Sequence, residues 1–281
     1  MPPKPPPTHF LCIPLVTTAS RPHLTRSLAA FREEVTAPNP SSAYGALPVP
    51  EQAIRPVGTV HLTLGVMSFL EPKPEPSGSG KSESLSGLRK LEEAKALLKS
   101  LKLKEIWQGM KEEEHPKITL RGLHSMQSPS KAAVLYAPPV DPLGHLQRFC
   151  EEVKAEFVQR GLMVEEGGRP LLLHATVVNT IYVKGRDQQQ AAGNRGGKKG
   201  GHGHHGHHGH HGHHGHRRGG GNKRERLTID AREILERYEE YTWMEGVKVE
   251  KVAICKMGAK KEMVDGVVVD EAYEVEEEIE F

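Results

Sequence analysis

Two stretches of alternating sequence decide the fold: TVHLTLGVM at residues 59–67 and PLLLHATVVNTIY at residues 170–182. In each stretch a histidine and the threonine two residues later share one face of a strand, because successive side chains of a strand point to opposite faces. Leucine, alanine and valine occupy the alternate positions. We therefore predict two strands that bury one face in a core and present His-x-Thr on the other.

The elements around these strands repeat in the order strand, helix, strand. The two copies are residues 10–16, 22–35 and 59–67, and residues 132–137, 141–160 and 170–182. Both helices carry the pattern L-x-x-F-x-E-E-V, which begins at Leu28 in one and at Leu146 in the other. A repeat of this kind indicates a duplicated unit. We predict an α+β fold with two lobes of antiparallel sheet, helices on the outer faces, and a cleft on a pseudo-two-fold axis between the lobes.

Further elements follow from apolar periodicity and turn residues. Helices are predicted over residues 88–107 and 230–241, the second opened by a capping box of Asp230 and Glu233. The remaining strands are predicted over residues 117–126, 246–257 and 264–273. A Pro- and Ser-rich loop is expected at residues 37–56, and a flexible insertion at 71–86.

Composition sets the domain boundaries within the 281 residues. We predict a single bilobal domain over residues 8–184 and 225–275, interrupted by a Gly/His-rich disordered insertion at 185–224. A disordered, Pro-rich leader (1–7) and an acidic tail (276–281) complete the chain. The insertion contains ten histidines between residues 201 and 216, whose imidazoles could bind a transition metal, but the composition favours a flexible, solvated loop.

Cysteine usage and hydropathy restrict the class of protein. The three cysteines (Cys12, Cys150 and Cys255) lie far apart in apolar runs, which argues against a disulfide framework or a zinc site and favours buried core positions. No apolar run reaches the roughly 18 residues of a membrane span, and the N-terminus has no apolar signal region. We expect an intracellular monomer, in the nucleus, the cytoplasm or both, with no membrane association.

The two motifs together suit displacement at a phosphodiester. Such a reaction needs a base for the attacking oxygen and an acid for the leaving oxygen, and two imidazoles divide these roles near neutral pH. We predict His61 and His174 as the acid–base pair, with either assignment open. Thr63 and Thr176 are predicted to bind the non-bridging phosphate oxygens. This chemistry requires no metal and no cofactor.

Some residues and functions remain as alternatives. A third His-x-Thr at His23 opens a predicted helix and lacks alternating apolar partners, so we exclude it. Tyr182, just after the second motif, would either stack a base or pack at the rim. A binding module that grips an RNA end without turnover would use the same two motifs. A scaffold that docks a kinase regulatory subunit would need an amphipathic helix. Towards the end of the chain, residues 230–241 are the candidate for it.

The sequence resembles a known superfamily at these positions. His-Leu-Thr-Leu from His61 and His-Ala-Thr-Val from His174, on two related lobes, are similar to the two-histidine phosphoesterases, which include 2′-5′ RNA ligase-like proteins and cyclic phosphodiesterases. More closely, the chain resembles the phosphoesterase domain of kinase-A anchoring proteins and of activating signal cointegrator complex subunit 1. The resemblance is carried further by Leu120-Arg121-Gly122-Leu123, Val134-Leu135-Tyr136-Ala137 and Asp230-Ala231-Arg232-Glu233-Ile234-Leu235.

This resemblance implies a function and partners. It implies a metal-independent phosphodiesterase acting on RNA or nucleotide phosphodiesters, either 2′-5′ linkages or 2′,3′-cyclic phosphate ends. The alternative that it implies is a non-catalytic, RNA-end-binding subunit of a transcription coactivator or repair complex of the cointegrator type.

Overall fold

The computed structural model describes residues 5–38, 41, 48–70, 82–109, 115–164, 170–183 and 226–281. The first motif lies in a four-stranded antiparallel sheet of order β11-β8-β1-β2. Its strands are β1 (His9–Pro14), β2 (His61–Met67), β8 (Lys251–Lys256) and β11 (Val275–Glu280). β1 is central and almost wholly buried, as its apolar sequence HFLCIP predicts. This sheet forms the first lobe.

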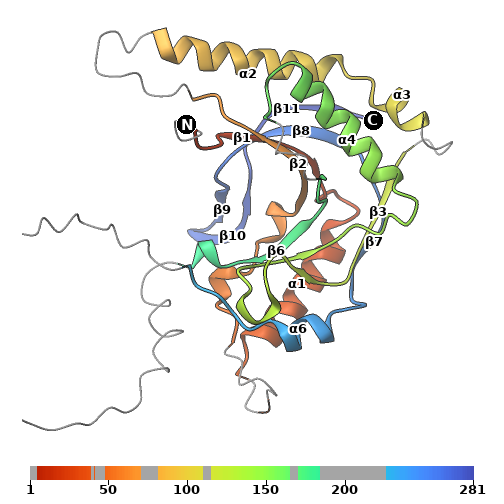
Figure 1. Ribbon diagram of the computed structural model, residues 1–281. Coiled ribbons are helices and arrows are strands. Elements are labelled where there is room, and N and C mark those ends of the chain that lie inside the picture. The colour runs from red at the N-terminus through yellow and green to blue at the C-terminus, as the bar shows by residue number, and fades with distance from the viewer. Residues whose placement is uncertain are drawn as a thin grey trace, which may run out of the picture.

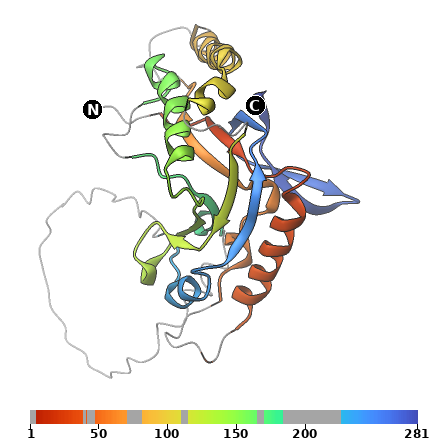
Figure 2. The same ribbon diagram turned by 90° about the vertical axis from the view of Figure 1, so that its right-hand side faces the viewer.

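The second motif lies in a separate antiparallel sheet of order β4-β5-β6. Its strands are β4 (His124–Ser125), β5 (Val134–Ala137) and β6 (Ala175–Asn179), and beside it β3 (Lys117–Arg121) pairs with β7 (Thr242–Lys248). These strands form the second lobe. A two-stranded hairpin of β9 (Lys260–Val264) and β10 (Val267–Ala272) projects from the body, drawn in blue in Figure 2.

Each long helix of the repeat packs on the opposite lobe from the strand that precedes it in the chain. Helix α1 (Arg21–Thr36) leaves the first lobe and packs on β7, whereas α4 (His145–Gln159) leaves the second lobe and packs on β2. In Figure 1, α2 (Ser82–Ser100) and α4 accordingly lie above the β11-β8-β1-β2 sheet, while α1 and α6 (Arg232–Arg237) lie at the opposite end. The short elements are α3 (Leu103–Gln108), η1 (Glu51–Ala53), η2 (Val57–Thr59), η3 (Pro129–Lys131) and η4 (Thr180–Tyr182).

The core confirms the predicted α+β duplication. The two copies of L-x-x-F-x-E-E-V bury matching apolar positions on α1 and α4. The matching positions are Leu28, Phe31 and Val35 on α1, and Leu146, Phe149 and Val153 on α4; Leu24 and Phe157 extend the two buried faces. Both sets belong to one continuous hydrophobic cluster, so the two lobes share a core rather than fold around separate ones. The three cysteines are buried and unbridged, as predicted.

The prediction of an acidic tail at residues 276–281 was wrong. These residues belong to β11, which pairs with β8 at the edge of the first sheet. Ile279 and Phe281 pack against the core on one face of the strand. Carboxylates are neutralised by lysines, with Glu277 2.7 Å from Lys99 and Glu278 2.8 Å from Lys251. Composition suggested a solvated tail because the alternating apolar positions are few.

The predicted strand over residues 246–257 is two strands. β7 pairs with β3 in the second lobe and β8 pairs with β1 in the first, so the chain crosses between lobes at residues 249–250. The predicted strand over 117–126 similarly divides at Gly122, whose φ is +79°. A residue without Cβ tolerates that conformation, and the Gly122 carbonyl accepts a hydrogen bond from the Trp243 indole at 2.9 Å.

Other helices and strands also differ from their predicted bounds. The predicted helix over residues 88–107 is α2 followed by α3, and α2 already begins at Ser82 inside the expected flexible insertion. The predicted strand over residues 170–182 contracts to β6 and η4. Only residues 232–237 of the predicted 230–241 helix are helical, and Tyr238 after them is buried. Residues 1–4, 71–81 and the Gly/His-rich insertion at 185–224 lie outside the described residues.

Candidate active site

His61 begins β2 and is anchored by its own chain. Its Nδ1 lies 2.7 Å from the carbonyl oxygen of Thr59, which accepts only, so Nδ1 carries the proton and donates it. In the neutral imidazole Nε2 is then the acceptor, and the Thr63 hydroxyl donates to it at 3.0 Å. The predicted pair of His61 and Thr63 therefore shares one face of β2, and Nε2 is the nitrogen able to accept a proton.

His174 is held in the same way, immediately before β6. Its Nδ1 lies 2.8 Å from the carbonyl oxygen of Leu172, again two residues earlier in the chain. By the same argument Nδ1–H is the donor, and Nε2 is the nitrogen left for chemistry. Each imidazole also contacts an aromatic ring of the neighbouring strand, His61 with Phe10 at 4.8 Å and His174 with Tyr136 at 5.5 Å between ring centroids.

Both motif strands bulge directly after the threonine. Thr63 lies opposite Cys12 and Gly65 opposite Leu11, so Leu64 is an extra residue in β2. The same displacement makes Val177 an extra residue in β6, directly after Thr176. A bulge re-aims the neighbouring side chains and frees backbone groups from the ladder. Because the bulge recurs at equivalent positions, it is a feature of the duplicated unit.

Backbone contacts bring the two motifs together. The freed carbonyl of Val177 accepts a hydrogen bond from the backbone N–H of Arg55 at 2.8 Å, and Ile54 forms a bridge with Val178. The loop that leads into β2 is thereby fastened to β6. His61 and His174 lie close enough for their charges to interact. The arrangement joins the two sequence-predicted pairs across the lobes.

The electrostatic surroundings keep His61 neutral. The pKa of His61 is lowered to about 4, mainly by burial and to a smaller extent by the positive charges of His174 and Arg55. The hydrogen bond to the Thr59 carbonyl acts in the opposite direction and raises this pKa. Burial dominates because the charged imidazolium loses solvation that one carbonyl does not replace.

Sequence reasoning missed two residues near the first motif. Arg55 lies in the expected loop over residues 37–56, but its guanidinium Cζ is 3.9 Å from the ring centroid of Tyr182. Tyr273, between β10 and β11, has its ring 5.3 Å from that of His61. Burial raises the pKa of Tyr273 to about 12. The sequence feature that could have identified Arg55 is a charged residue between the apolar Ile54 and Pro56. No sequence feature distinguished Tyr273.

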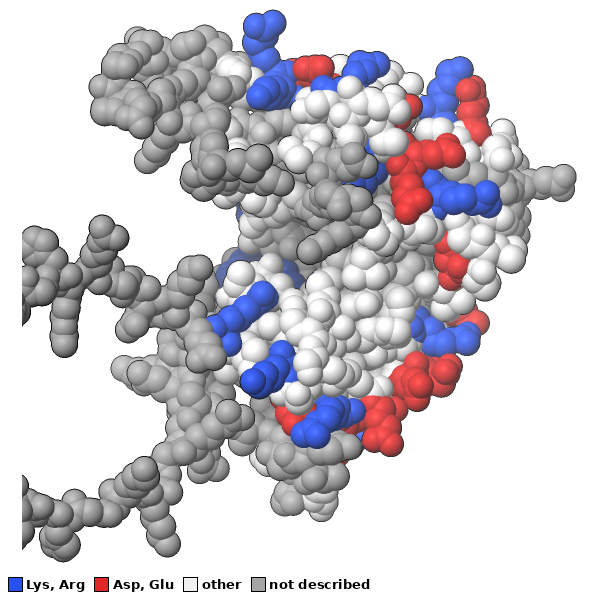
Figure 3. Space-filling view, in the orientation of Figure 1, with Lys and Arg blue, Asp and Glu red and all other residues white. Residues whose placement is uncertain are grey.

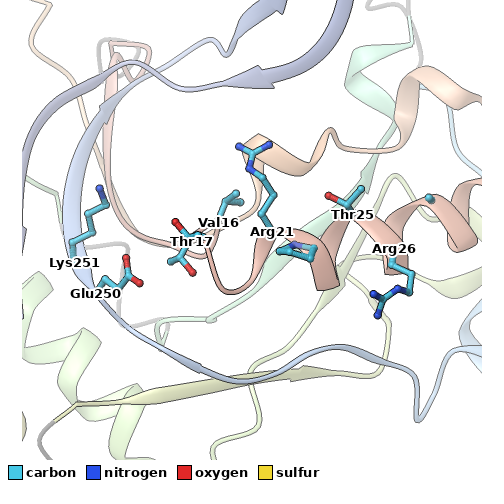
Figure 4. Close-up of a pocket in the computed structure, with 10 residues that line it drawn as sticks. Val16, Thr17, Arg21, Thr25, Arg26, Glu250 and Lys251 are labelled. Carbon is cyan, nitrogen blue, oxygen red and sulfur yellow. The ribbon is translucent and has the colours of Figure 1, made fainter.

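Two other features lie away from the motifs. His23 is exposed on α1, as expected for the excluded third His-x-Thr. Figure 4 shows a pocket of about 710 Å³ between the start of α1 and residues 250–251, where Arg21, Arg26 and Lys251 contribute cationic side chains. Neither His61 nor His174 lines it. We place the candidate site at the two histidines because they are imidazoles that can exchange protons near neutral pH, whereas none of the described histidines lines the pocket.

Charge is unevenly spread over the described surface. On the face shown in Figure 3, acidic side chains lie mostly on the right-hand side, interspersed with basic ones, and basic side chains prevail left of centre. Within the described ranges, no three His, Cys, Asp or Glu side chains lie close enough together to hold a metal ion. No described helix is long and apolar enough to cross a membrane.

Comparison with known proteins decides the family. The model of the AKAP7 2′5′ RNA ligase-like domain matches residues 7–281, which include both motifs. The chain belongs to this family. The family is one of two-histidine phosphoesterases, as the two motifs predicted, and it implies an enzyme class that acts on phosphodiesters. No curated protein sequence matches the chain.

Several solved structures are also similar to the chain. A crystal structure of E. coli LigT with 3′-AMP is 12% identical, with 98% of each chain covered and a TM-score of 0.42. LigT with ATP is likewise 12% identical over 98% of each chain, with a TM-score of 0.41. The protein TT0787 of Thermus thermophilus is 14% identical over 97% of each chain, with a TM-score of 0.42.

Proposed function

We propose that the chain is a metal-independent phosphodiesterase that acts on RNA-type phosphodiesters, either 2′-5′ linkages or 2′,3′-cyclic phosphate ends. One observation carries the proposal. Two imidazoles from equivalent strands each donate Nδ1–H to the carbonyl two residues earlier and keep Nε2 for proton transfer. A matched pair of this kind suits a reaction that takes one proton and delivers another.

The pKa of His61 supports the assignment of roles. An imidazole whose pKa lies near 4 is neutral at physiological pH, so it accepts a proton and serves as the general base. His61 Nε2 takes the proton of the attacking water, whose oxygen bonds to phosphorus. The bond from phosphorus to the leaving oxygen breaks, and His174 in its charged form donates a proton to that oxygen. The products leave His61 charged and His174 neutral, and proton exchange with water resets the pair.

The hydroxyl groups and Tyr182 have supporting roles in this proposal. Thr63 donates to His61 Nε2 in the free protein, and we expect it to turn to a non-bridging phosphate oxygen when substrate binds. Thr176, at the equivalent position of β6, serves the other side of the phosphate. Tyr182 offers the ring face opposite Arg55 to a nucleobase.

A turnover panel tests the proposal. Oligonucleotides with one 2′-5′ linkage, one 3′-5′ linkage or a 2′,3′-cyclic phosphate end are incubated with the protein, with and without a chelator. We expect cleavage of the 2′-5′ or cyclic substrate, unchanged by the chelator. Binding of an RNA end without cleavage of any substrate would instead favour the non-catalytic alternative. Activity lost in chelator and restored by Mg²⁺ or Mn²⁺ would point to metal-assisted hydrolysis.

Partners and location stay predictions. Membership of a cointegrator-type complex, a monomeric state and an intracellular location were expected from the sequence, and co-purification from cells would test the first. The kinase-docking alternative is weakened, because the helix it needs has six residues and Tyr238 beside it is buried against Phe31.

A further inference from the structure

Arg55 occupies the junction between the two motifs. It lies six residues before His61, and its backbone N–H is bonded to Val177, the residue after Thr176. Only 4% of its surface is exposed. A long charged side chain is seldom buried to this extent without a partner. The position and the burial together call for an explanation beyond packing.

Two tyrosines hold the guanidinium in place. Its Cζ lies 3.9 Å from the ring centroid of Tyr182, which is the geometry of a cation–π contact. Arg55 also hydrogen-bonds to the side chain of Tyr273, and Tyr273 in turn hydrogen-bonds to Tyr182. The plane and direction of the guanidinium are therefore constrained from two sides. Such constraint reduces the conformational entropy lost when a ligand binds.

The charge of Arg55 lacks a counterion in the described part of the chain. None of the ion pairs found there includes Arg55. Its Nη2 is buried and has no hydrogen-bond partner among the described residues. An unpaired buried cation destabilises a fold, so proteins that retain one commonly pair it with an anionic ligand. The free Nη2 marks where that anion would bind.

An anion at Nη2 would lie beside the catalytic base. The charge of Arg55 reaches His61, because it contributes to the low pKa of that imidazole. Tyr273 contacts both residues, with its ring 5.3 Å from the His61 ring. The guanidinium and the His61 imidazole thus share Tyr273 as a neighbour, and the Thr63 hydroxyl hydrogen-bonds to the same imidazole at 3.0 Å.

We propose that Arg55 is the phosphate-binding cation of this site, and that Tyr182 and Tyr273 are positioning residues that hold its guanidinium. The inference rests on the proposed function, since the anion is the substrate phosphodiester. Guanidinium nitrogens donate to the non-bridging oxygens and offset the negative charge that grows on them during displacement. This role differs from that of the threonines, because hydroxyl groups bring no net charge.

Binding of inorganic phosphate tests the inference without turnover. Isothermal titration and the phosphate-dependent rise in melting temperature are measured for the full chain and for Arg55→Met, Arg55→Gln and Arg55→Lys. Methionine and glutamine remove the charge but fill much of the volume, so at least one folded variant is expected. Arg26→Gln is the matched control, because Arg26 is an exposed arginine in the pocket of Figure 4.

We expect the uncharged variants to bind phosphate about 10- to 100-fold more weakly than wild type and to lose its thermal stabilisation. Arg55→Lys should recover part of the affinity, and Arg26→Gln should match wild type. Removing the charge should also raise the pKa of His61 and shift its titration, followed by NMR, to higher pH. Unchanged phosphate affinity in Arg55→Met or Arg55→Gln would overturn the inference, as would a loss confined to Arg26→Gln.

The outcome for Arg55 is separable from that for the proposed function. Loss of phosphate binding in the Arg55 variants, together with no turnover by wild type on the oligonucleotide panel, would support the phosphate site and refute the phosphodiesterase. Turnover by wild type that is unchanged in the Arg55 variants would support the phosphodiesterase and refute the phosphate-binding role of Arg55. If both hold, the defect should fall on KM for a 2′,3′-cyclic nucleotide and on kcat, because the guanidinium contacts both ground state and transition state.

Discussion

The regions around His61 and His174 are alike in local geometry and unlike in surroundings. Both imidazoles donate Nδ1–H to the carbonyl two residues earlier, and both strands bulge after the threonine. Yet Thr59, which anchors His61, is 4% exposed, whereas Leu172, which anchors His174, is 50% exposed. A duplicated unit thus provides two histidines with the same local geometry, whose anchoring residues differ in burial.

The region around His61 is also contacted by residues from other parts of the chain. Tyr273 and Arg55 lie near His61, and the β10 carboxylate of Asp270 accepts a hydrogen bond from the Gly58 backbone N–H at 2.9 Å. Asp270 also pairs with Arg21 at 2.7 Å. The C-terminal hairpin therefore secures the segment that leads into β2. The difference between the two regions lies in what packs on each motif, not in the motif itself.

The largest expected effect comes from removing either imidazole. His61→Ala and His174→Ala should each lower kcat by about 10²–10⁴-fold, because each loses one proton-transfer partner. His23→Ala, which removes the exposed histidine of the third His-x-Thr, should stay near wild type. Steady-state kinetics on the best substrate of the panel would measure all three. Equal damage from His23→Ala would refute the choice of motif pair.

The inequality of the two histidines predicts a pH signature. If His61 is the base, the acidic limb of the bell in kcat/KM should fall near pH 4 instead of near the ordinary histidine value of about 6.5. His174→Ala should raise the pKa of His61, since it removes a positive charge that lowers it. NMR titration of the His61 ring would measure both values. A His61 pKa near 6.5 in wild type would remove the basis for assigning the roles.

The same shift has a consequence for stability. The unfolded chain binds a proton at His61 below about pH 6.5, whereas the folded protein does so only below about pH 4. The contribution of neutral His61 is therefore fully present above pH 6.5 and is lost as pH falls from about 6.5 to 4. The free energy of unfolding should decline less steeply over that range in His61→Ala than in wild type. Denaturant titrations at several pH values compare the two.

A smaller effect is expected where the hairpin docks on the first region. In Gly58→Ala the new Cβ would lie 2.4 Å from the backbone oxygen of Glu271, so β10 must move away. We expect the free energy of unfolding to fall by about 1–3 kcal/mol, as for overpacked sites. Gly109→Ala is the control, because its Cβ would meet no described atom closer than 3.5 Å. Equal unfolding midpoints for the two variants would show that the hairpin contact is dispensable.

The smallest effect is expected from the Gly/His-rich insertion, which belongs to neither region. Deletion of residues 191–221 should leave both the melting temperature and kcat close to wild type, because this composition supports no packed core. Differential scanning calorimetry and the turnover panel would test this. A large fall in melting temperature would mean that the insertion takes part in the fold.

Sequence alone determined the features that depend on local periodicity. Alternation in TVHLTLGVM predicted the strand and the shared face of His61 and Thr63, and the 3.6-residue period predicted α1 and α4 with their buried faces. Repetition of strand, helix and strand predicted the duplicated fold. These inferences held because each needs only neighbours in the chain.

Only the tertiary structure decided what depends on distant contacts. The exchange of α1 and α4 between lobes, the pairing of β11 in place of an acidic tail, and the approach of Arg55 and Tyr273 to His61 join segments far apart in sequence. The lowered pKa of His61 belongs to this group as well. The motifs of the two histidines are nearly identical in sequence, and a pKa is set by burial and nearby charge, which no local pattern encodes.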